Sequence, residues 1–212
     1  MTDTRWTLDP DIDASLENFE LPPKAFMEQL AAERAPLEAA APKVGEPAAA
    51  FMAQCLAADG TPTDAQVSLA DFNGQPLALM FGNYTCPIYR GQTERFNEIY
   101  AELHERLAFL LIYTSEAHPE DGWQVDINNT QNVVYKQPST TTARAAIAAD
   151  CIQSCGTAMP VAIDDMQNTI NKRYSASPER LYLIDADGIV RHRSPPGPFK
   201  MSAIDAWYSA LT

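Results

Sequence analysis

One cysteine stands where a predicted strand gives way to a predicted helix. The Cys86 segment, Phe81-Gly82-Asn83-Tyr84-Thr85-Cys86-Pro87, follows an apolar run from Leu77 to Phe81, and Pro87 suits the first turn of a helix. The dipole and unpaired N–H groups of a helix start stabilise a thiolate, so we expect Cys86 to have a lowered pKa and to be reachable by reagents. A thiolate attacks disulfides, peroxides and soft electrophiles, whereas an inert buried cysteine is the alternative interpretation.

Three further cysteines occur in the chain. Cys55 lies in a predicted strand, Ala50 to Leu56, and we interpret it as a core residue. Cys151 and Cys155 form a C-x-x-x-C pair at helical spacing, so both sulfurs could lie on one helix face. They could bridge each other if the helix frays, resolve an oxidised Cys86, or be structural. Two cysteines without a third cysteine or a histidine nearby make a poor zinc site, so we expect no metal.

Short apolar strands alternate with amphipathic helices from Val44 onward, which is the pattern of a sheet covered by helices. After the Cys86 segment, the patterns predict a helix from about Ile88 to Leu107, a strand at Ala108 to Thr114, a helix from about Thr142 to Ile152, a strand at Val161 to Asp164, a short helix around Gln167 to Tyr174, strands at Arg180 to Asp185 and Gly188 to Arg193, and a helix from Ser202, its N-cap, to Leu211. This order is typical of an α/β thioredoxin-like fold, with a central mixed β-sheet flanked by helices.

The N-terminal segment, residues 1–43, differs in composition from the rest of the chain. It carries nine acidic and four basic side chains and is interrupted by five prolines. The spacing of Phe26, Leu30 and Leu37 predicts a helix from about Lys24 to Glu38. We therefore expect an acidic N-terminal arm over residues 1–43, packed on the domain or on a second subunit, and a redox domain over residues 44–212.

The composition limits the classes of function. The 212 residues are 46% hydrophobic, which suits one globular domain with an appendage. A net charge of −13, without a cluster of Lys and Arg, argues against nucleic acid or an acidic membrane surface as a partner. The apolar runs are far shorter than the ~20 residues of a membrane span, and Met1 to Pro10 lacks the apolar core of a secretory signal. We therefore expect a cytoplasmic protein, whose cysteines are catalytic, redox-switching or buried rather than permanently paired.

Three blocks of sequence resemble the iodothyronine deiodinase family, and together they span roughly residues 77 to 211. They are the Cys86 segment; residues 109–123, with Glu116-Ala117-His118-Pro119 before Asp121-Gly122-Trp123; and residues 160–182, which end in Pro178-Glu179-Arg180-Leu181-Tyr182. The resemblance implies a thiol-dependent oxidoreductase, with Cys86 in the position of selenocysteine and with Glu116 and His118 in the catalytic surroundings. It further implies a small-molecule substrate, an external thiol reductant, no bound cofactor and a homodimer.

A histidine suits the chemistry that this resemblance implies. With an ordinary pKa near ~6.5, His118 can supply or accept the proton that leaves with iodide, or stabilise the thiolate as an ion pair. A loop-ordering role is the alternative. The resemblance also places Met159-Pro160 before a strand, as the cis-proline step beside the catalytic sulfur. The residues that we expect around the active site are Asn83, Tyr84, Thr85, Pro87, Trp123, Met159 and Pro160.

Two departures from the family pattern leave the substrate open. Tyr135 or Lys136 stands where the family has a histidine, and Pro195-Pro196-Gly197-Pro198 lacks the arginine that some members carry there. The resemblance implies that, in the family, the histidine and the arginine hold the phenol and carboxylate ends of the iodothyronine substrate. A peroxiredoxin-like thiol peroxidase is an alternative function, although Asn83 replaces the threonine that helps to bind peroxide in that group. A non-enzymatic scaffold with a redox fold is the other alternative, because fold does not dictate function.

Overall fold

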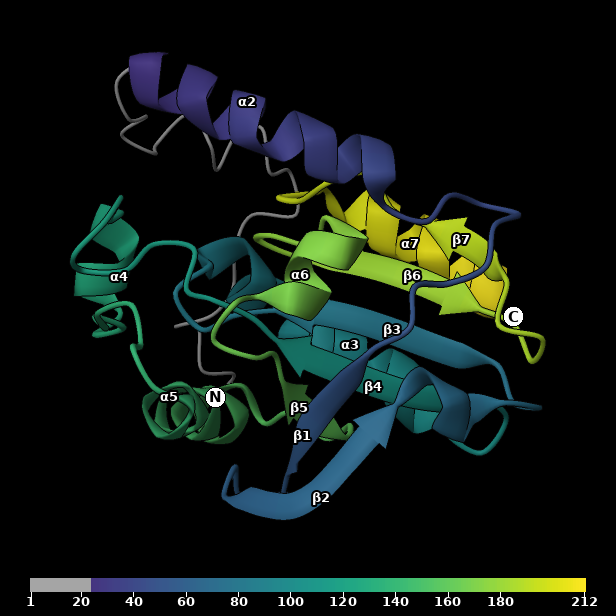
Figure 1. The fold of residues 1–212 in the computed structure, drawn as a ribbon. Helices are drawn as coiled ribbons and strands as arrows, with labels where there is room; N and C mark the ends of the chain where they lie inside the picture. Colours follow the sequence, from purple (N-terminus) through teal and green to yellow (C-terminus); the bar gives the residue numbers. More distant parts are fainter. Residues whose placement is uncertain (1–23) are drawn as a thin grey trace.

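The computed structural model describes residues 24–212, in which a seven-stranded mixed sheet is flanked by helices (Figure 1). The strands are β1 (Met52–Leu56), β2 (Pro62–Ser68), β3 (Leu77–Gly82), β4 (Ala108–Tyr113), β5 (Val161–Ile163), β6 (Arg180–Ile184) and β7 (Val190–Arg193). The helices are α2 (Lys24–Ala40), η2 (Leu69–Phe72), α3 (Pro87–Leu103), α4 (Asp126–Thr130), α5 (Thr141–Cys155), α6 (Thr169–Tyr174) and α7 (Met201–Leu211). The expected architecture of a mixed sheet with flanking helices is confirmed.

The sheet places β3 near its centre, in the strand order β2-β1-β5-β4-β3-β6-β7. β3 and β5 run parallel to β4, whereas β6 pairs with β3 in the antiparallel direction. Every residue of β3 is buried, as its unbroken apolar sequence requires. Ala78 and Met80 face a core that includes residues of α3, α5 and α7, and Leu79 and Phe81 face a second core that includes residues of α6. Packing on both faces makes the end of β3 a firm support for the Cys86 segment.

Several element boundaries differ from those predicted. α3 ends at Leu103, four residues before the predicted end, while α5 continues to Cys155, beyond the predicted end. α7 begins at Met201 with Lys200 as its N-cap, so the N-cap prediction for Ser202 is wrong. β2 and α4 were not predicted, because β2 is a polar edge strand without a buried residue and α4 is only five residues long.

The predicted arm helix is confirmed as α2, and the part of the arm before Lys24 lies outside the described residues. The C-terminal half of α2 is fixed by polar contacts: Arg34 Nη1 donates to Gly197 O at 3.0 Å, and Glu38 binds Arg180 and Arg193, each at 2.7 Å. Figure 1 shows α2 lying across the outside of the domain.

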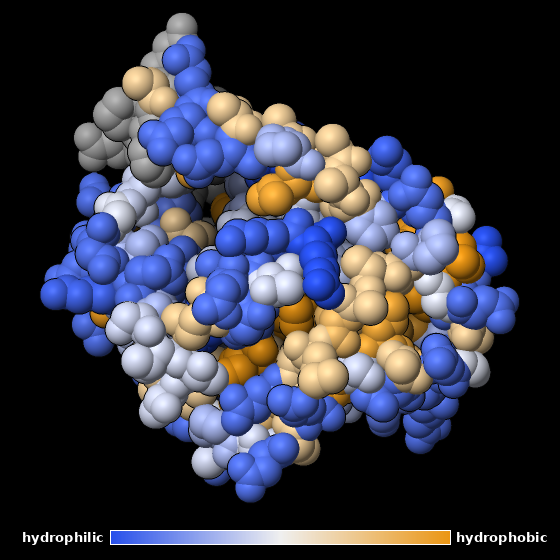
Figure 2. Space-filling model, in the orientation of Figure 1, coloured by the Kyte–Doolittle hydropathy of each residue, from blue (hydrophilic) through white to orange (hydrophobic). Residues whose placement is uncertain are grey.

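Hydrophilic residues dominate the outline of the face seen in Figure 2, and hydrophobic ones gather toward its centre. Among the described helices, none has the length and apolarity to span a membrane.

The cis-proline step lies at a different proline from the one expected. Within residues 24–212 the cis peptide bonds are Ser177–Pro178 and Gly197–Pro198, so the prediction for Met159–Pro160 is wrong. The reason is strand order: β4 separates β5 from β3, whereas β6 pairs with β3 directly. The chain that enters β6 therefore lies beside the end of β3, where Pro178 O accepts a hydrogen bond from Asn83 Nδ2 at 2.9 Å.

Candidate active site

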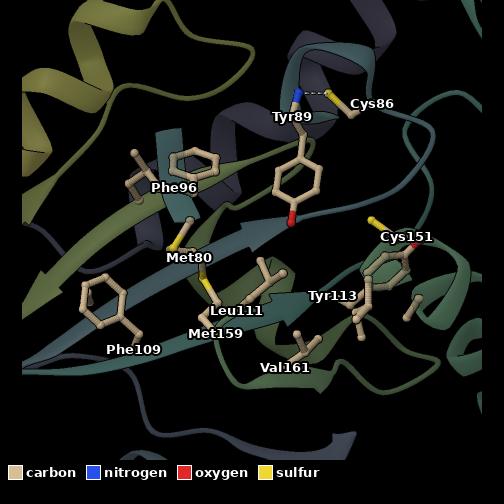
Figure 3. Packing of buried hydrophobic residues seen from close by; sticks show 14 of the residues in the cluster. Met80, Cys86, Tyr89, Phe96, Phe109, Leu111, Tyr113, Cys151, Met159 and Val161 are labelled. Carbon is tan, nitrogen blue, oxygen red and sulfur yellow. Dashed lines mark hydrogen bonds between the residues drawn. The ribbon is translucent and has the colours of Figure 1, made fainter. Parts of the chain in front are cut away.

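Cys86 is the N-cap of α3, with Pro87 as the first helical residue, and this placement follows the prediction. Its Sγ accepts a hydrogen bond from Tyr89 N at 3.5 Å (Figure 3). The residue is only 1% exposed. Burial raises the pKa of the thiol, and the negative charge of Glu179 raises it further. The expectations of an accessible thiol and a lowered pKa are therefore wrong, because loss of hydration outweighs the stabilisation offered by one helix start.

Asn83 fixes the Cys86 segment to two other parts of the chain. Its Oδ1 accepts hydrogen bonds from Cys86 N at 3.1 Å, from Ala117 N at 3.0 Å and from Thr85 Oγ1 at 3.3 Å. Its Nδ2 donates to Pro178 O, and the residue is fully buried. The amide is therefore occupied by internal partners, which weakens the peroxidase alternative, since that function needs a group here that faces the peroxide.

Glu116, in the loop that follows β4, holds the same segment in place. Its Oε2 accepts from Thr85 N at 2.9 Å and its Oε1 from Tyr113 Oη at 2.5 Å, while Tyr113 Oη accepts from Tyr84 N at 3.0 Å. Burial raises the pKa of Glu116, although these hydrogen bonds oppose the rise. Both carboxyl oxygens hold the loop in place, so the geometry makes Glu116 a positioning residue.

His118 is fixed as one particular tautomer. Its backbone N donates to Thr85 Oγ1 at 3.0 Å, and its ring stacks edge-on against Trp123 with the ring centroids 4.5 Å apart. Nδ1 lies 3.1 Å from Trp123 O, and since a carbonyl only accepts, Nδ1 carries the proton and Nε2 keeps its lone pair. Burial lowers the pKa of His118 to about 4. The ring is therefore neutral at neutral pH, which contradicts the ion-pair role and leaves proton or hydrogen-bond acceptance at Nε2.

A buried arginine supplies positive charge beside the site. The Arg90 guanidinium donates to Tyr84 O, to Asn128 Oδ1 at 2.7 Å and to Gln131 Oε1 at 2.6 Å, and so connects α3 to α4 and its following turn. Its charge favours the Cys86 thiolate, but less than burial and Glu179 disfavour it. Tyr135, in the region where the family has a histidine, packs on Tyr84 with the ring centroids 5.5 Å apart.

Glu179 is the residue that sequence reasoning missed. It is fully buried beside the Cys86 segment, and its Oε1 accepts from Phe199 N at 3.2 Å. Its Oε2 has no hydrogen-bond partner in the described part of the protein. Burial raises its pKa to about 8, so the carboxyl is largely protonated at neutral pH. Its position directly after Pro178 was visible in the sequence, but the pairing of β6 with β3 was not.

The remaining predicted residues lie on α5 and immediately before β5. Met159 packs in the core, and Pro160 O accepts from Leu111 N at 3.0 Å at the start of β5. Cys151 is buried on α5, and Cys155 is partly exposed at the end of the same helix. Within residues 24–212, no group of three or more metal-ligating side chains comes together.

A family model described as iodothyronine deiodinase matches residues 38–209. The chain belongs to the iodothyronine deiodinase family. It is 31% identical over 136 residues to the thyroxine 5-deiodinase of Gallus gallus, an alignment that covers 63% of this chain and 50% of that protein. It is 32% identical over 125 residues to the type I iodothyronine deiodinase of Xenopus laevis, covering 59% and 47%. The chain thus spans about half the length of these relatives.

Solved structures with similar folds confirm that this deiodinase-family chain has a thioredoxin-like fold. The thioredoxin domain of a thiol-disulfide oxidoreductase from Bacteroides vulgatus superposes with a TM-score of 0.53 at 13% identity, covering 78% of this chain and 98% of that one. The peroxidoxin BcpB from Mycobacterium tuberculosis gives 0.52 at 17% identity, covering 80% and 96%. Such low identities establish the fold alone, whereas membership of the deiodinase family supports a thiol redox function.

Proposed function

We propose that this deiodinase-family chain is a thiol-dependent reductase in which Cys86 removes iodine from a small iodinated phenol. The observation that carries the proposal is the burial of the Cys86 thiol together with the Glu179 carboxyl at the start of α3. Active sites often bring titratable groups with strongly shifted pKa values next to each other.

The pair of groups provides a route to the thiolate despite burial. Two adjacent buried negative charges are unfavourable, so a thiolate at Cys86 requires Glu179 to be in its neutral, protonated form. Glu179, when ionised, accepts the Cys86 proton and becomes a neutral carboxylic acid. The resulting thiolate is stabilised by the Tyr89 N–H and by the charge of Arg90.

The thiolate then attacks the iodine atom of the substrate. An S–I bond forms and the C–I bond breaks, its electron pair stays on carbon, and carbon takes the proton held by Glu179. Cys86 is thereby oxidised to a sulfenyl iodide and the substrate is reduced. A first external thiol attacks the Cys86 sulfur, expels iodide and leaves a mixed disulfide with release of a proton. A second external thiol regenerates Cys86 and leaves as the oxidised disulfide.

His118 and Tyr135 bear on the choice of substrate. The neutral His118 ring can accept a hydrogen bond from a phenol at Nε2. The resemblance implies a histidine where this chain has Tyr135 or Lys136, and the Tyr135 ring packs on Tyr84 while its hydroxyl donates to Asp150 Oδ2 at 2.9 Å. We therefore propose a phenolic substrate other than an iodothyronine. Because a thiol is a poorer nucleophile than a selenol, we also expect slow turnover.

Iodide release from 2-iodophenol in the presence of dithiothreitol tests the proposal. We expect release by the full chain, no release by Cys86→Ser, and strongly reduced release by Glu179→Gln. Cys55→Ser is the matched control, because Cys55 lies on β1 in a different part of the sheet, and it should keep full activity. Peroxide consumption without iodide release would instead support the thiol peroxidase. If Cys86→Ser kept both iodide release and peroxide consumption undiminished, only the non-enzymatic scaffold would remain as an explanation.

A homodimer in the cytoplasm, without nucleic acid or membrane as a partner, belongs to the same proposal. The net charge of −13 supports the absence of polyanionic partners. Light scattering coupled to size-exclusion chromatography tests the dimer, and a species with the mass of one chain at all concentrations would rule it out.

A further inference from the structure

The last turn of α5 carries two thiols that the mechanism at Cys86 does not use. Cys151 is 2% exposed. Cys155, four residues later, is partly exposed on the final turn of the same helix. The side chain of Cys155 interacts directly with that of Cys151, and after burial this is the second cause that raises the pKa of the Cys151 thiol. The fold therefore places one shielded and one accessible thiol side by side.

The thiols of α5 and the Cys86 sulfur belong to different helices. In Figure 3, Cys86 enters the core from the start of α3 and Cys151 from α5, and the ring of Tyr89 extends from α3 toward the sheet. Tyr89 is within electrostatic reach of Cys86, Cys151 and Cys155. The groups that shift the pKa of Cys86 most include neither thiol of α5. The thiol that interacts directly with Cys151 is that of Cys155.

We propose that Cys151 and Cys155 form a second redox site, a dithiol that a small disulfide oxidises to an internal bridge. Side chains four residues apart on a helix have Cβ atoms about 5–6 Å apart, and a disulfide needs roughly 3.5–4.5 Å. The last turn must therefore tighten or unwind when the bridge forms. That movement is local, because α5 ends at Cys155 and Gly156 follows in the left-handed conformation at φ 62°.

The difference in exposure sets the order of steps. The thiolate of Cys155 attacks one sulfur of the disulfide R–S–S–R, an S–S bond forms and R–S⁻ leaves with the proton of Cys155. The Cys151 thiolate then attacks the Cys155 sulfur, expels the second R–S⁻ and closes the bridge, and the proton of Cys151 goes to that leaving group. The protein loses two electrons and two protons, and the disulfide is reduced to two R–SH.

Titration of the full chain with 4,4′-dithiodipyridine tests this site. In Cys55→Ser/Cys86→Ser, which keeps only the pair, we expect two thiopyridones released per chain and no pyridyl group retained in the intact mass. In the same background with Cys151→Ala, we expect one thiopyridone and one retained pyridyl group on Cys155. Dithiothreitol should reverse both products.

Peptide mapping of the oxidised wild-type chain provides a test that does not depend on the variants. A peptide that joins residues 151 and 155 by a disulfide is the expected product. Recovery of Cys155 bridged to Cys86, or a stable pyridyl adduct on Cys155 while Cys151 is present, would overturn the proposal. Because the test reads disulfides and not iodide, its failure is distinguishable from failure of the proposed reductase.

Discussion

Glu179 is the charged group that most strongly disfavours a thiolate at Cys86. The two side chains come from adjacent strands that are distant in the sequence: Cys86 follows β3, and Glu179 immediately precedes β6, the antiparallel neighbour of β3. Since both groups are buried, water cannot hydrate and stabilise the ionised form of either one. In the resting protein the site therefore holds a neutral thiol, and any chemistry at Cys86 must begin with movement of a proton.

The buried Glu179 carboxyl should make the protein less stable as pH rises. Burial raises its pKa from 4.5 to about 8, so the native state binds a proton that the unfolded chain has already lost. The contribution of the neutral carboxyl to stability is fully present below pH 4.5 and is lost progressively as the pH approaches 8. We expect Glu179→Gln to flatten the decline of unfolding free energy over this range, by on the order of 1 kcal/mol per pH unit.

Urea denaturation of the wild-type protein and of Glu179→Gln, at pH values from 4.5 to 8, measures the unfolding free energy of each. Other buried acids, Glu116 and Asp164, have raised pKa values too, so the difference between the two curves isolates Glu179. Parallel curves would show that Glu179 is ionised in the folded protein at neutral pH.

His118 should titrate well below an ordinary histidine. Burial lowers its pKa from 6.5 to about 4, so the neutral ring contributes stability that is present above pH 6.5 and is lost as the pH falls through about 4. We expect the ring carbon resonances of His118 in a ¹H–¹³C NMR titration to stay at their neutral positions down to about pH 5. His118→Asn identifies the resonance. A midpoint above 6 would restore the imidazolium and with it the ion pair to the thiolate.

Replacing Asn83 with threonine, the residue of the peroxiredoxin pattern, should damage the fold instead of creating a peroxidase. A threonine hydroxyl cannot satisfy the donors that Asn83 Oδ1 accepts or reach Pro178 O as the amide does. Leaving such buried groups unpaired costs on the order of 2–3 kcal/mol. Urea denaturation and a peroxide consumption assay measure the two effects. The exposed Asn129→Thr serves as the control and should change neither, whereas a stable Asn83→Thr with new peroxidase activity would contradict this account.

The contact between α2 and the domain should depend on Glu38. Arg180 is 1% exposed, and without Glu38 its charge would remain buried with one backbone acceptor, Ser175 O. We expect Glu38→Gln to lower the unfolding free energy by on the order of 1–3 kcal/mol, less than for a fully buried pair because Glu38 is 33% exposed. Arg191→Gln removes an exposed ion pair of the neighbouring hairpin and should change little. Equal effects of the two substitutions in urea denaturation would show that Glu38 does not anchor α2.

Much of the fold could be read from local patterns. The unbroken apolar runs of β3 and β4 and the Cys86-Pro87 step at the start of α3 correspond to what the structure contains, because burial on both faces and helix capping are written into neighbouring residues. The three resembling blocks also identified the deiodinase family, which the family model confirms over residues 38–209.

The order of strands and the burial of the site were decided only by the tertiary structure. No local pattern shows that β6, and not β5, lies beside β3, so the sequence does not distinguish Pro178 from Pro160 as the cis-proline or indicate that Glu179 lies at the site. The direction of the pKa shift of Cys86 likewise cannot be predicted from the sequence. A helix start has a local signature, but desolvation and the charge of Glu179 act through space between segments 93 residues apart, and their sum reverses the direction of the pKa shift.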